Sequence, residues 1–264
     1  MQRLTSLLIW IGVSLLVLFW LPLIAVTRFF DRDPVRYRTG KMFRKLGLAI
    51  SRINPNWKIS LQGNKSANDR TPFIIVSNHL SNGDIPVISN LPWEMKWVAK
   101  KELFNLPIVG WMMRMAGDIP VDRRSRGKNI RTIKRCLFYL QRNCSVIFFP
   151  EGTRSRDGKV KDFSRIPFEL AIRNNFPILP LVIDGTRECL PKNTWIFEPD
   201  VHARLKVLEP VDPNKYESAD TDALVRDVRD QIIRQLMEWR DEPREQVDGL
   251  LHKNRNTNQS KPEN

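Results

Sequence analysis

The chain opens on a long run of apolar residues. From Leu4 to Val26 it reads LTSLLIWIGVSLLVLFWLPLIAV, 23 residues without a charged side chain. At about 1.5 Å per residue, a helix of this length can cross a hydrocarbon core of roughly 30 Å. A cleaved signal peptide is the alternative, but its apolar region is normally shorter and ends at a small-x-small site. The run therefore predicts an uncleaved membrane anchor.

The charges that flank this run predict its orientation. Arg3 alone precedes it, whereas a group of basic residues follows it. Because cytoplasmic flanks are enriched in Lys and Arg, we expect the C-terminal bulk to face the cytoplasm, on a single-pass or monotopic membrane protein. The basic residues that follow are Arg28, Arg32, Arg36, Arg38, Lys41, Arg44 and Lys45.

A second helical pattern comes next. Apolar residues recur at helical spacing from Met42 to Ile53, with basic residues between them. A basic amphipathic helix of this kind can lie in a membrane interface and contact anionic headgroups. The alternative is a surface helix that packs its apolar stripe on the rest of the protein. Directly after a spanning segment we prefer the interfacial interpretation, which makes residues 1–56 a membrane-anchoring region with the anchor at about 4–26.

Beyond residue 56 the pattern predicts alternating strands and helices. Short apolar runs bounded by polar residues or proline predict buried strands, and apolar positions at helical spacing predict helices over 130–140 and 224–239. This alternation is typical of an α/β domain with a mostly parallel central sheet flanked by helices, whose site lies in loops at strand ends. We expect it to occupy residues 57–250, before a disordered polar tail over 251–264. The predicted strands are 73–77, 145–149, 178–183 and 203–207.

Composition narrows the class of partner. The chain has 264 residues and a formal net charge of +14 at pH 7, which calls for nucleic acid or for an anionic membrane with phosphorylated substrates. The apolar anchor, and basic residues spread along the chain without a recognition motif, favour the membrane and exclude nucleic acid. Three cysteines do not make a disulfide framework. The three histidines lack the spacing of metal ligands, so we expect no metal site.

The first candidate for chemistry is the segment Asn78–Asp84, which reads NHLSNGD. His79 comes directly after a predicted strand, and Asp84 stands five residues on, where a helix is expected to begin. If the loop folds back, the carboxylate can accept a hydrogen bond from one ring nitrogen and leave the other to take a proton from an alcohol. A helix-capping aspartate beside an unreactive loop histidine is the alternative.

Two further polar clusters follow. The segment Gly117–Arg123 (GDIPVDR) leads into a basic run. A guanidinium is suited to binding a phosphate oxygen pair, although most of such a run would be solvated surface charge. The segment Phe149–Ser155 (FPEGTRS) places Glu151 where a strand ends in a glycine turn. There Glu151 could orient Arg123 or an acceptor hydroxyl.

These blocks, followed by ILPLVIDGT at 178–186, resemble in order and spacing the glycerolipid acyltransferase superfamily, in particular the PlsC-type lysophosphatidate acyltransferases. The resemblance covers about Phe73 to Thr186. It implies transfer of a fatty acyl group from acyl-CoA or acyl carrier protein to the free hydroxyl of lysophosphatidate, giving phosphatidate, without a metal or cofactor. It also implies that His79 is the general base and that Asp84 orients it.

The resemblance further implies the contacts with the substrates. Arg123 and the turn Glu151–Gly152 would help bind the phosphate and glycerol of the acceptor. Lys100 would add charge near that phosphate, and Pro180 would belong to the acyl-chain pocket. Other substrate contacts are expected at Asn78, Ser81, Gly117, Thr153 and Arg154.

The chain departs from the family pattern in one place. The family usually has Phe-Lys-x-Gly after the third block, whereas this chain has Phe163-Ser164-Arg165-Ile166-Pro167-Phe168. The change bears on the donor contact and on the identity of the acceptor. Another lysophospholipid, glycerol-3-phosphate or an ornithine-type lipid remain alternative acceptors, and a thioester hydrolase is an alternative enzyme. Because no serine or cysteine stands beside a base, direct transfer in a ternary complex is favoured over an acyl-enzyme.

Overall fold

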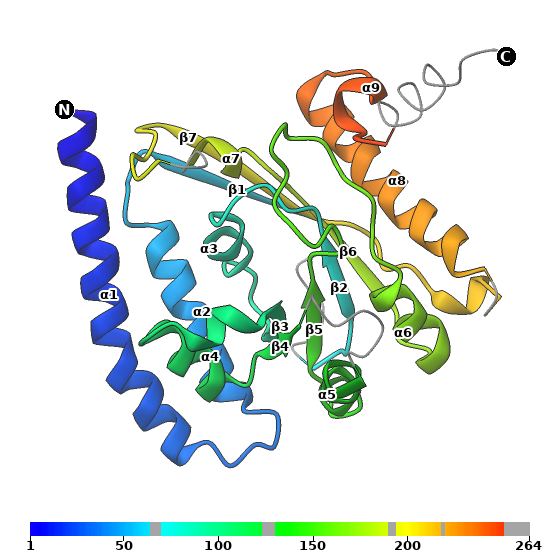
Figure 1. Ribbon diagram of the computed structural model, residues 1–264, viewed down its shortest axis with the longest axis horizontal. Coiled ribbons are helices and arrows are strands. Elements are labelled where there is room, and N and C mark those ends of the chain that lie inside the picture. The colour runs from blue at the N-terminus through cyan, green and yellow to red at the C-terminus, as the bar shows by residue number, and fades with distance from the viewer. Residues whose placement is uncertain (64–69, 123–129, 190–193, 218–219, 251–264) are drawn as a thin grey trace, which may run out of the picture.

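A sheet of seven strands forms the centre of the computed structural model, which describes residues 1–63, 70–122, 130–189, 194–217 and 220–250 (Figure 1). The strand order is β1-β7-β6-β2-β5-β3-β4. Neighbouring strands are parallel, except that β6 and β7 are antiparallel. The strands are β1 (Trp57–Gly63), β2 (Ile74–Ser77), β3 (Met95–Lys100), β4 (Ile119–Val121), β5 (Ser145–Phe148), β6 (Ile178–Asp184) and β7 (Val201–Val207).

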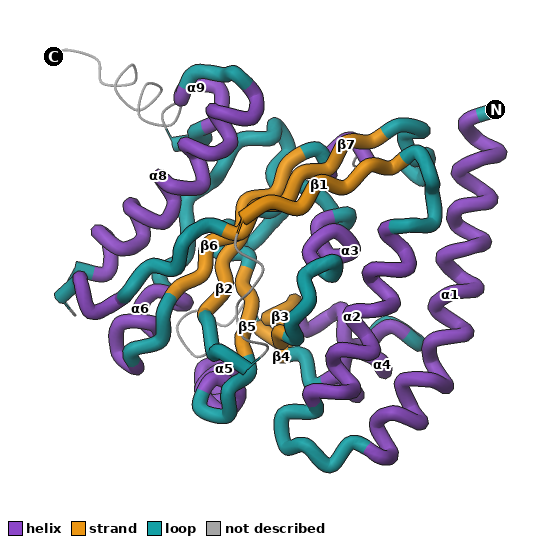
Figure 2. Tube along the Cα trace, turned by 180° about the vertical axis from the view of Figure 1, so that it is seen from behind, coloured by secondary structure: helices purple, strands orange, loops and turns teal. Residues whose placement is uncertain are grey.

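Helices cover both faces of the sheet. Helices α1 to α4 gather on one side, and α6 and α8 lie on the other (Figure 2). A separate cluster of buried apolar side chains fills the space on each side, which is how a two-faced sheet excludes water. The helices are α1 (Gln2–Phe30), α2 (Tyr37–Ser51), α3 (Asp84–Ile88), η1 (Lys101–Asn105), α4 (Val109–Ala116), α5 (Ile130–Leu140), α6 (Ile166–Asn174), α7 (Thr186–Cys189), η2 (Pro213–Lys215), α8 (Thr221–Arg240) and α9 (Arg244–Val247).

The predicted α/β fold with a mostly parallel sheet is confirmed. The four predicted strands appear as β2, β5, β6 and β7, and the two predicted helices appear as α5 and α8. Strands β1, β3 and β4 were not predicted. The tail over 251–264 lies outside the described residues.

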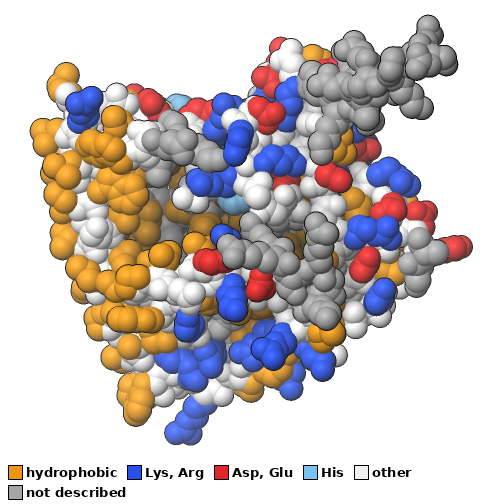
Figure 3. All heavy atoms as spheres, viewed as in Figure 1, with side chains coloured by type: hydrophobic (Ala, Val, Ile, Leu, Met, Phe, Trp, Pro, Cys, Tyr) orange, Lys and Arg blue, Asp and Glu red, His pale blue; other side chains and the backbone are white. Residues whose placement is uncertain are grey.

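Helix α1 lies along the domain instead of leaving it as a separate spanning segment. It is long and apolar enough to cross a membrane by length and composition. Its inner side nevertheless packs on the protein along much of its length, with Ile9 and Ile24 buried. Near its start, the Trp10 indole donates to the carbonyl of Trp195, 2.8 Å away. The outer side presents a continuous band of exposed hydrophobic side chains (Figure 3).

Helix α2 packs much of its apolar stripe on protein, whereas the interfacial interpretation of that stripe stays a prediction. Met42, Leu46 and Ile50 join a cluster with α1 and α4. The alternative, a helix that packs on the rest of the protein, describes these side chains. A hydrophobic stripe is equally satisfied by lipid or by another helix, so the periodicity alone could not distinguish the two.

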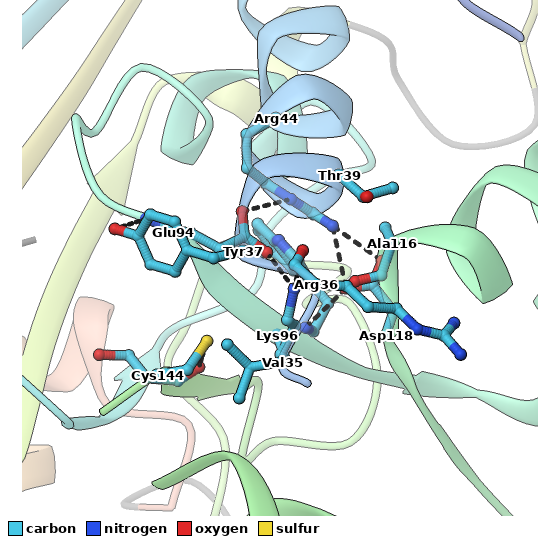
Figure 4. A network of polar contacts seen from close by, with 12 residues as sticks. Val35, Arg36, Tyr37, Thr39, Arg44, Glu94, Lys96, Ala116, Asp118 and Cys144 are labelled. Carbon is cyan, nitrogen blue, oxygen red and sulfur yellow. Dashed lines mark hydrogen bonds and ion pairs between the residues drawn. The ribbon is translucent and has the colours of Figure 1, made fainter. Parts of the chain in front are cut away.

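A buried network of charges joins α2 to the edge of the sheet (Figure 4). The Lys96 ammonium lies 2.8 Å from a Glu94 carboxylate oxygen and donates to the carbonyl of Ala116 at 2.8 Å. The Arg44 guanidinium of α2 donates to both oxygens of Asp118, and the backbone N–H of Trp97 donates to the same carboxylate. Although burial opposes its charge, Glu94 holds the pKa of Lys96 above its ordinary value. These ion pairs fasten the N-terminal helices to β3 and to the turn before β4.

Candidate active site

His79 and Asp84 form a hydrogen-bonded pair at the end of the central strand β2. The distance between His79 Nδ1 and Asp84 Oδ2 is 2.6 Å. The same oxygen accepts the backbone N–H groups of Leu80 and Ser81, so the loop wraps around the carboxylate. Asp84 is fully buried, whereas the His79 side chain is 14% exposed. Since Nδ1 is engaged by Asp84, Nε2 is the nitrogen that can accept a proton.

The segment Phe149–Ser155 (FPEGTRS) holds the backbone of His79 in place. The His79 N–H donates to Glu151 Oε1 at 2.9 Å, and its carbonyl accepts the N–H of Ser155 at 2.7 Å. The other Glu151 oxygen accepts the N–H of Lys161 at 3.2 Å. On the ring itself, Phe149 stacks with its centroid 4.0 Å away. The Glu151 carboxylate therefore helps to orient the loop that carries His79, and its expected part in binding the acceptor stays a prediction.

Two other residues of the first block have structural partners. The Asn78 amide donates to the carbonyl of Ile183 and accepts its N–H, so it continues the pairing with β6. The Ser81 hydroxyl accepts the N–H of Gly83. Both side chains are buried. These bonds give Asn78 and Ser81 a role in shaping the loop, and the expected contact of these residues with substrate stays a prediction.

A cavity of about 410 Å³ opens beside His79. Four cationic side chains line it, together with the Phe149 and Trp97 rings. Lys161, which the sequence did not single out, also donates from Nζ to the Thr153 hydroxyl and to the carbonyl of Arg154. The cavity thus combines a base, an apolar wall and an excess of positive charge. The four cations are Lys100, Arg154, Arg156 and Lys161.

The remaining predicted residues are dispersed. Thr153 lines the cavity, and Gly152 forms the adjacent turn at φ 71°, a conformation that side-chain-bearing residues rarely adopt. Pro180 is buried in β6 beside Val76 of β2, away from the cavity lining. Gly117 lies in a different cavity, beside β4. Arg123 lies outside the described residues.

Thr186 is a site residue that the sequence analysis missed. Its hydroxyl donates to Asp84 Oδ1, the oxygen that His79 does not use. The signal lay at the end of the segment 178–186 (ILPLVIDGT), where Thr186 follows Asp184-Gly185, but nothing in the sequence placed it next to Asp84. Among the described residues, no three His, Cys, Asp or Glu side chains gather so that they could hold a metal ion.

The half-buried Glu151 carboxyl gives the protein a pH-dependent stability. Burial raises its pKa from the ordinary 4.5 to about 7. The folded state therefore holds this proton more tightly than the unfolded chain. The resulting stabilisation is fully present below about pH 4.5 and is lost as the pH rises through about 7.

Glu151→Gln cannot ionise and so lacks this contribution. We expect the melting temperature of the wild type, relative to that of Glu151→Gln, to fall between pH 5 and pH 8. Thermal unfolding in matched buffers measures the difference. A difference that stays constant over this range would contradict the raised pKa.

The chain is similar to known acyltransferases in both sequence and structure. The family model described as acyltransferase matches residues 58–184. The chain is similar to chloroplastic 1-acyl-sn-glycerol-3-phosphate acyltransferases of Arabidopsis thaliana (32% identical, covering 77% of this chain and 56% of the relative) and Brassica napus (35%, covering 68% and 52%). It therefore spans just over half the length of these relatives. In structure it is similar to the 1-acyl-sn-glycerophosphate acyltransferase PlsC of Thermotoga maritima, with a TM-score of 0.77 and 28% identity over 92% of this chain and 97% of that one.

Proposed function

We propose that the chain transfers a fatty acyl group from a thioester donor to the free hydroxyl of lysophosphatidate, forming phosphatidate; the match of the acyltransferase family model to residues 58–184 and the structural similarity to PlsC support this. The observation that carries the proposal is the His79–Asp84 pair, which opens on a cavity lined by four cations. The similar proteins are themselves named as acyltransferases that act on this acceptor, which supports the proposal. Acyl-CoA and acyl carrier protein both supply the required thioester.

The proposed reaction is a direct transfer. As the acceptor oxygen attacks the thioester carbonyl carbon, His79 Nε2 takes the hydroxyl proton; the new C–O bond forms, the C–S bond breaks, and the proton passes to the leaving thiolate. Asp84 holds the ring in the required tautomer and stabilises the imidazolium that forms. This chemistry needs one base and two aligned substrates, and it needs no cofactor.

An acyl-enzyme on cysteine is disfavoured. All three cysteines are buried, and burial raises the pKa of each thiol to about 12. A thiol in this state contains too little thiolate at neutral pH to act as a nucleophile. We therefore place both substrates on the protein together.

A thioester hydrolase with the same site is the competing function, and one assay separates the two. The purified full chain is given acyl-CoA with and without lysophosphatidate, and free thiol, free fatty acid and phosphatidate are measured. Under our proposal thiol release depends on the acceptor and equals phosphatidate formed. Thiol release that is independent of the acceptor and matched by free fatty acid would identify a hydrolase.

The cavity cations predict a phosphate-dependent effect on acceptor binding. Arg154→Gln removes one guanidinium from the lining, so we expect the KM for lysophosphatidate to rise roughly tenfold while the KM for the donor changes little. Steady-state kinetics with each substrate varied in turn measures both values. The exposed Arg173 of α6 provides the control, since Arg173→Gln removes the same charge far from the cavity lining. A phosphate-free monoacylglycerol should abolish the difference between Arg154→Gln and the wild type.

We also propose that the protein is monotopic, with the outer side of α1 in one membrane leaflet and the catalytic domain on the cytoplasmic surface. The proposal is supported by the packing of the inner side of α1 on the domain and by the exposed apolar band opposite. An acceptor lipid would then reach His79 without leaving the membrane surface.

Charged substitutions on that band should weaken membrane attachment. Leu15 and Phe19 are 62% and 61% exposed, so Leu15→Glu with Phe19→Glu leaves the protein's own packing intact. We expect the membrane-bound fraction after sedimentation to fall by roughly half or more, because charge is costly in lipid. Leu15→Ile with Phe19→Leu preserves the apolar surface and should remain bound. If the charged pair stayed fully membrane-bound, this face would not be the attachment surface.

A further inference from the structure

A second basic cavity lies at the edge of the sheet, beside β4. It has a volume of about 510 Å³, and its walls are η1, the end of α4 with the turn that follows it, β4 and α5. Among the described residues that line the cavity, Asp118 is the one with an acidic side chain. Its carboxylate already accepts hydrogen bonds from Arg44 and from the Trp97 N–H. The cavity therefore carries uncompensated positive charge. Its cations are Lys101, Arg114, Arg131 and Arg135.

This cavity borders the apolar surface of the protein. Helix α4, which forms one wall, packs against α1 and α2. Its Trp111 is 55% exposed, and Leu106 just before the helix is also exposed. In Figure 3, Lys and Arg side chains gather directly beside the hydrophobic band. A ligand in this cavity would thus lie where the proposed membrane surface meets the domain.

We propose that the cavity binds the phosphate of an anionic phospholipid headgroup. Arg131 and Arg135 stand one helical turn apart on α5, so their guanidinium groups can hold one phosphate between them. A basic pocket next to an apolar membrane-facing surface is a setting in which anionic headgroups are recognised. The cavity shares no described lining residue with the one beside His79, so this lipid is separate from the acceptor. Its role would be to hold the protein in a fixed orientation on the membrane.

The test compares two charge-matched double variants of the full chain. Arg131→Gln with Arg135→Gln removes two cations from the cavity, whereas Lys134→Gln with Arg142→Gln removes two exposed cations on or just beyond the same helix. Flotation with vesicles of phosphatidylcholine, with or without one-fifth phosphatidylglycerol, measures membrane partitioning without reference to catalysis. We expect the cavity variant to lose about tenfold of the preference for anionic vesicles, and the control variant to lose less than twofold. Equal losses would assign the preference to diffuse surface charge and overturn the proposal.

Free phosphate is the other source of the same chemistry. Adding inorganic phosphate at an ionic strength matched with chloride should leave wild-type flotation unchanged, because a lipid phosphate anchored in the membrane has a far higher effective concentration at the cavity. Selective loss of anionic-vesicle binding in phosphate would show instead that the cavity takes a free anion.

A separate observation concerns Thr186, and the inference from it depends on the proposed function. Asp84 Oδ2 already accepts hydrogen bonds from His79, Leu80 and Ser81, and the Thr186 hydroxyl donates to Oδ1. Thr186 is 1% exposed at the start of α7. The turn before it requires Gly185, at φ 78°, where an added Cβ would come within 2.0 Å of the His202 carbonyl oxygen. The end of β6 is thus built to bring this hydroxyl to Asp84.

We infer that Thr186 is a positioning residue, which acts through Asp84 on the orientation of His79. Without the hydroxyl, Oδ1 loses its hydrogen bond, and the carboxylate can rotate away from the plane in which it holds the imidazole. A small misplacement of a catalytic group lowers turnover steeply while leaving substrate binding largely intact. The rest of the loop would keep its contacts with Glu151 and Ser155.

Thr186→Val keeps the shape of the side chain and removes the hydroxyl, whereas Thr186→Ser keeps the hydroxyl. We expect Thr186→Val to lower kcat by roughly 10- to 100-fold with both KM values within twofold, and Thr186→Ser to recover most of the loss. Equal impairment of both variants, or a valine variant within threefold of the wild type, would overturn the inference. His79→Ala serves as the reference: if it too were active, the proposed reaction would fail, and not only the role of Thr186.

Discussion

His79→Ala should reduce acyl transfer by at least 10²- to 10⁴-fold, roughly the contribution of a positioned general base. The imidazole is the group whose free nitrogen opens on the cavity, and its other nitrogen is held by Asp84 at 2.6 Å. The protein should remain folded, because the side chain stands at the mouth of a cavity and the loop is fixed by backbone bonds to Glu151 and Ser155. Radiolabelled acyl transfer to lysophosphatidate measures the loss, and thermal unfolding checks the fold.

The matched control for this variant is His202→Ala. His202 is an exposed histidine on β7, so its replacement should leave the rate unchanged. Asp84→Asn should also lose roughly 10²- to 10⁴-fold, since an amide in place of the carboxylate can neither fix the tautomer nor stabilise the imidazolium. Near wild-type turnover in His79→Ala would exclude His79 as the base.

Lys96→Met should cause the largest loss of stability, about 3–5 kcal/mol of unfolding free energy. The ammonium is fully buried and is surrounded by a Glu94 oxygen at 2.8 Å and the carbonyls of Ala116 and Arg36. Removing it leaves the Glu94 carboxylate inside the protein without its nearest counter-charge. Denaturant unfolding of the detergent-solubilised protein measures the loss, with Lys58→Met on the exposed side of β1 as the control.

A double variant separates the loss of the Glu94–Lys96 ion pair from the cost of leaving the Glu94 carboxylate buried without a counter-charge. In Glu94→Gln with Lys96→Met, no unpaired carboxylate remains at this position. We therefore expect part of the stability to return relative to Lys96→Met alone. A loss below 1 kcal/mol in the single variant would mean that water or Arg44 compensates Glu94, and that the network does not fasten the N-terminal helices as described.

The same network explains why part of the fold escaped prediction. Strand β3 carries the fully buried Lys96, and the buried Glu94 stands just before the strand, so the sequence around it reads as polar although the start of the strand is interior. Strand β1 shows the alternation of a half-buried edge strand, and β4 has three residues and a proline. The apolar runs of β2, β5 and β6 leave no such ambiguity, since every residue of each is buried.

In the candidate site, too, some contacts could be predicted from the sequence and others could not. The His79–Asp84 pair could be predicted because both residues lie in one short loop, where spacing determines which groups can meet. The partners of Asn78 and Asp84 on β6 and α7 lie 105 and 102 residues away. No local pattern reveals a hydrogen bond over such a separation, so the pairing of Asn78 with Ile183 and the bond of Thr186 to Asp84 could not be predicted.

The docking site for the N-terminal half of α1 is assembled late in synthesis. Gln2 and Ser6 hydrogen-bond to Phe197, Trp10 donates to Trp195, and β1 pairs with β7. At about 5–20 residues per second, a ribosome needs roughly 10–40 s to pass from the first of these partners to the second. Throughout that interval α2 and α4 can cover part of the helix, but the surface that covers its N-terminal half has not been made. Lipid is the partner available at that time, so we expect membrane engagement to precede closure of the sheet, and the folded domain to be completed on the bilayer.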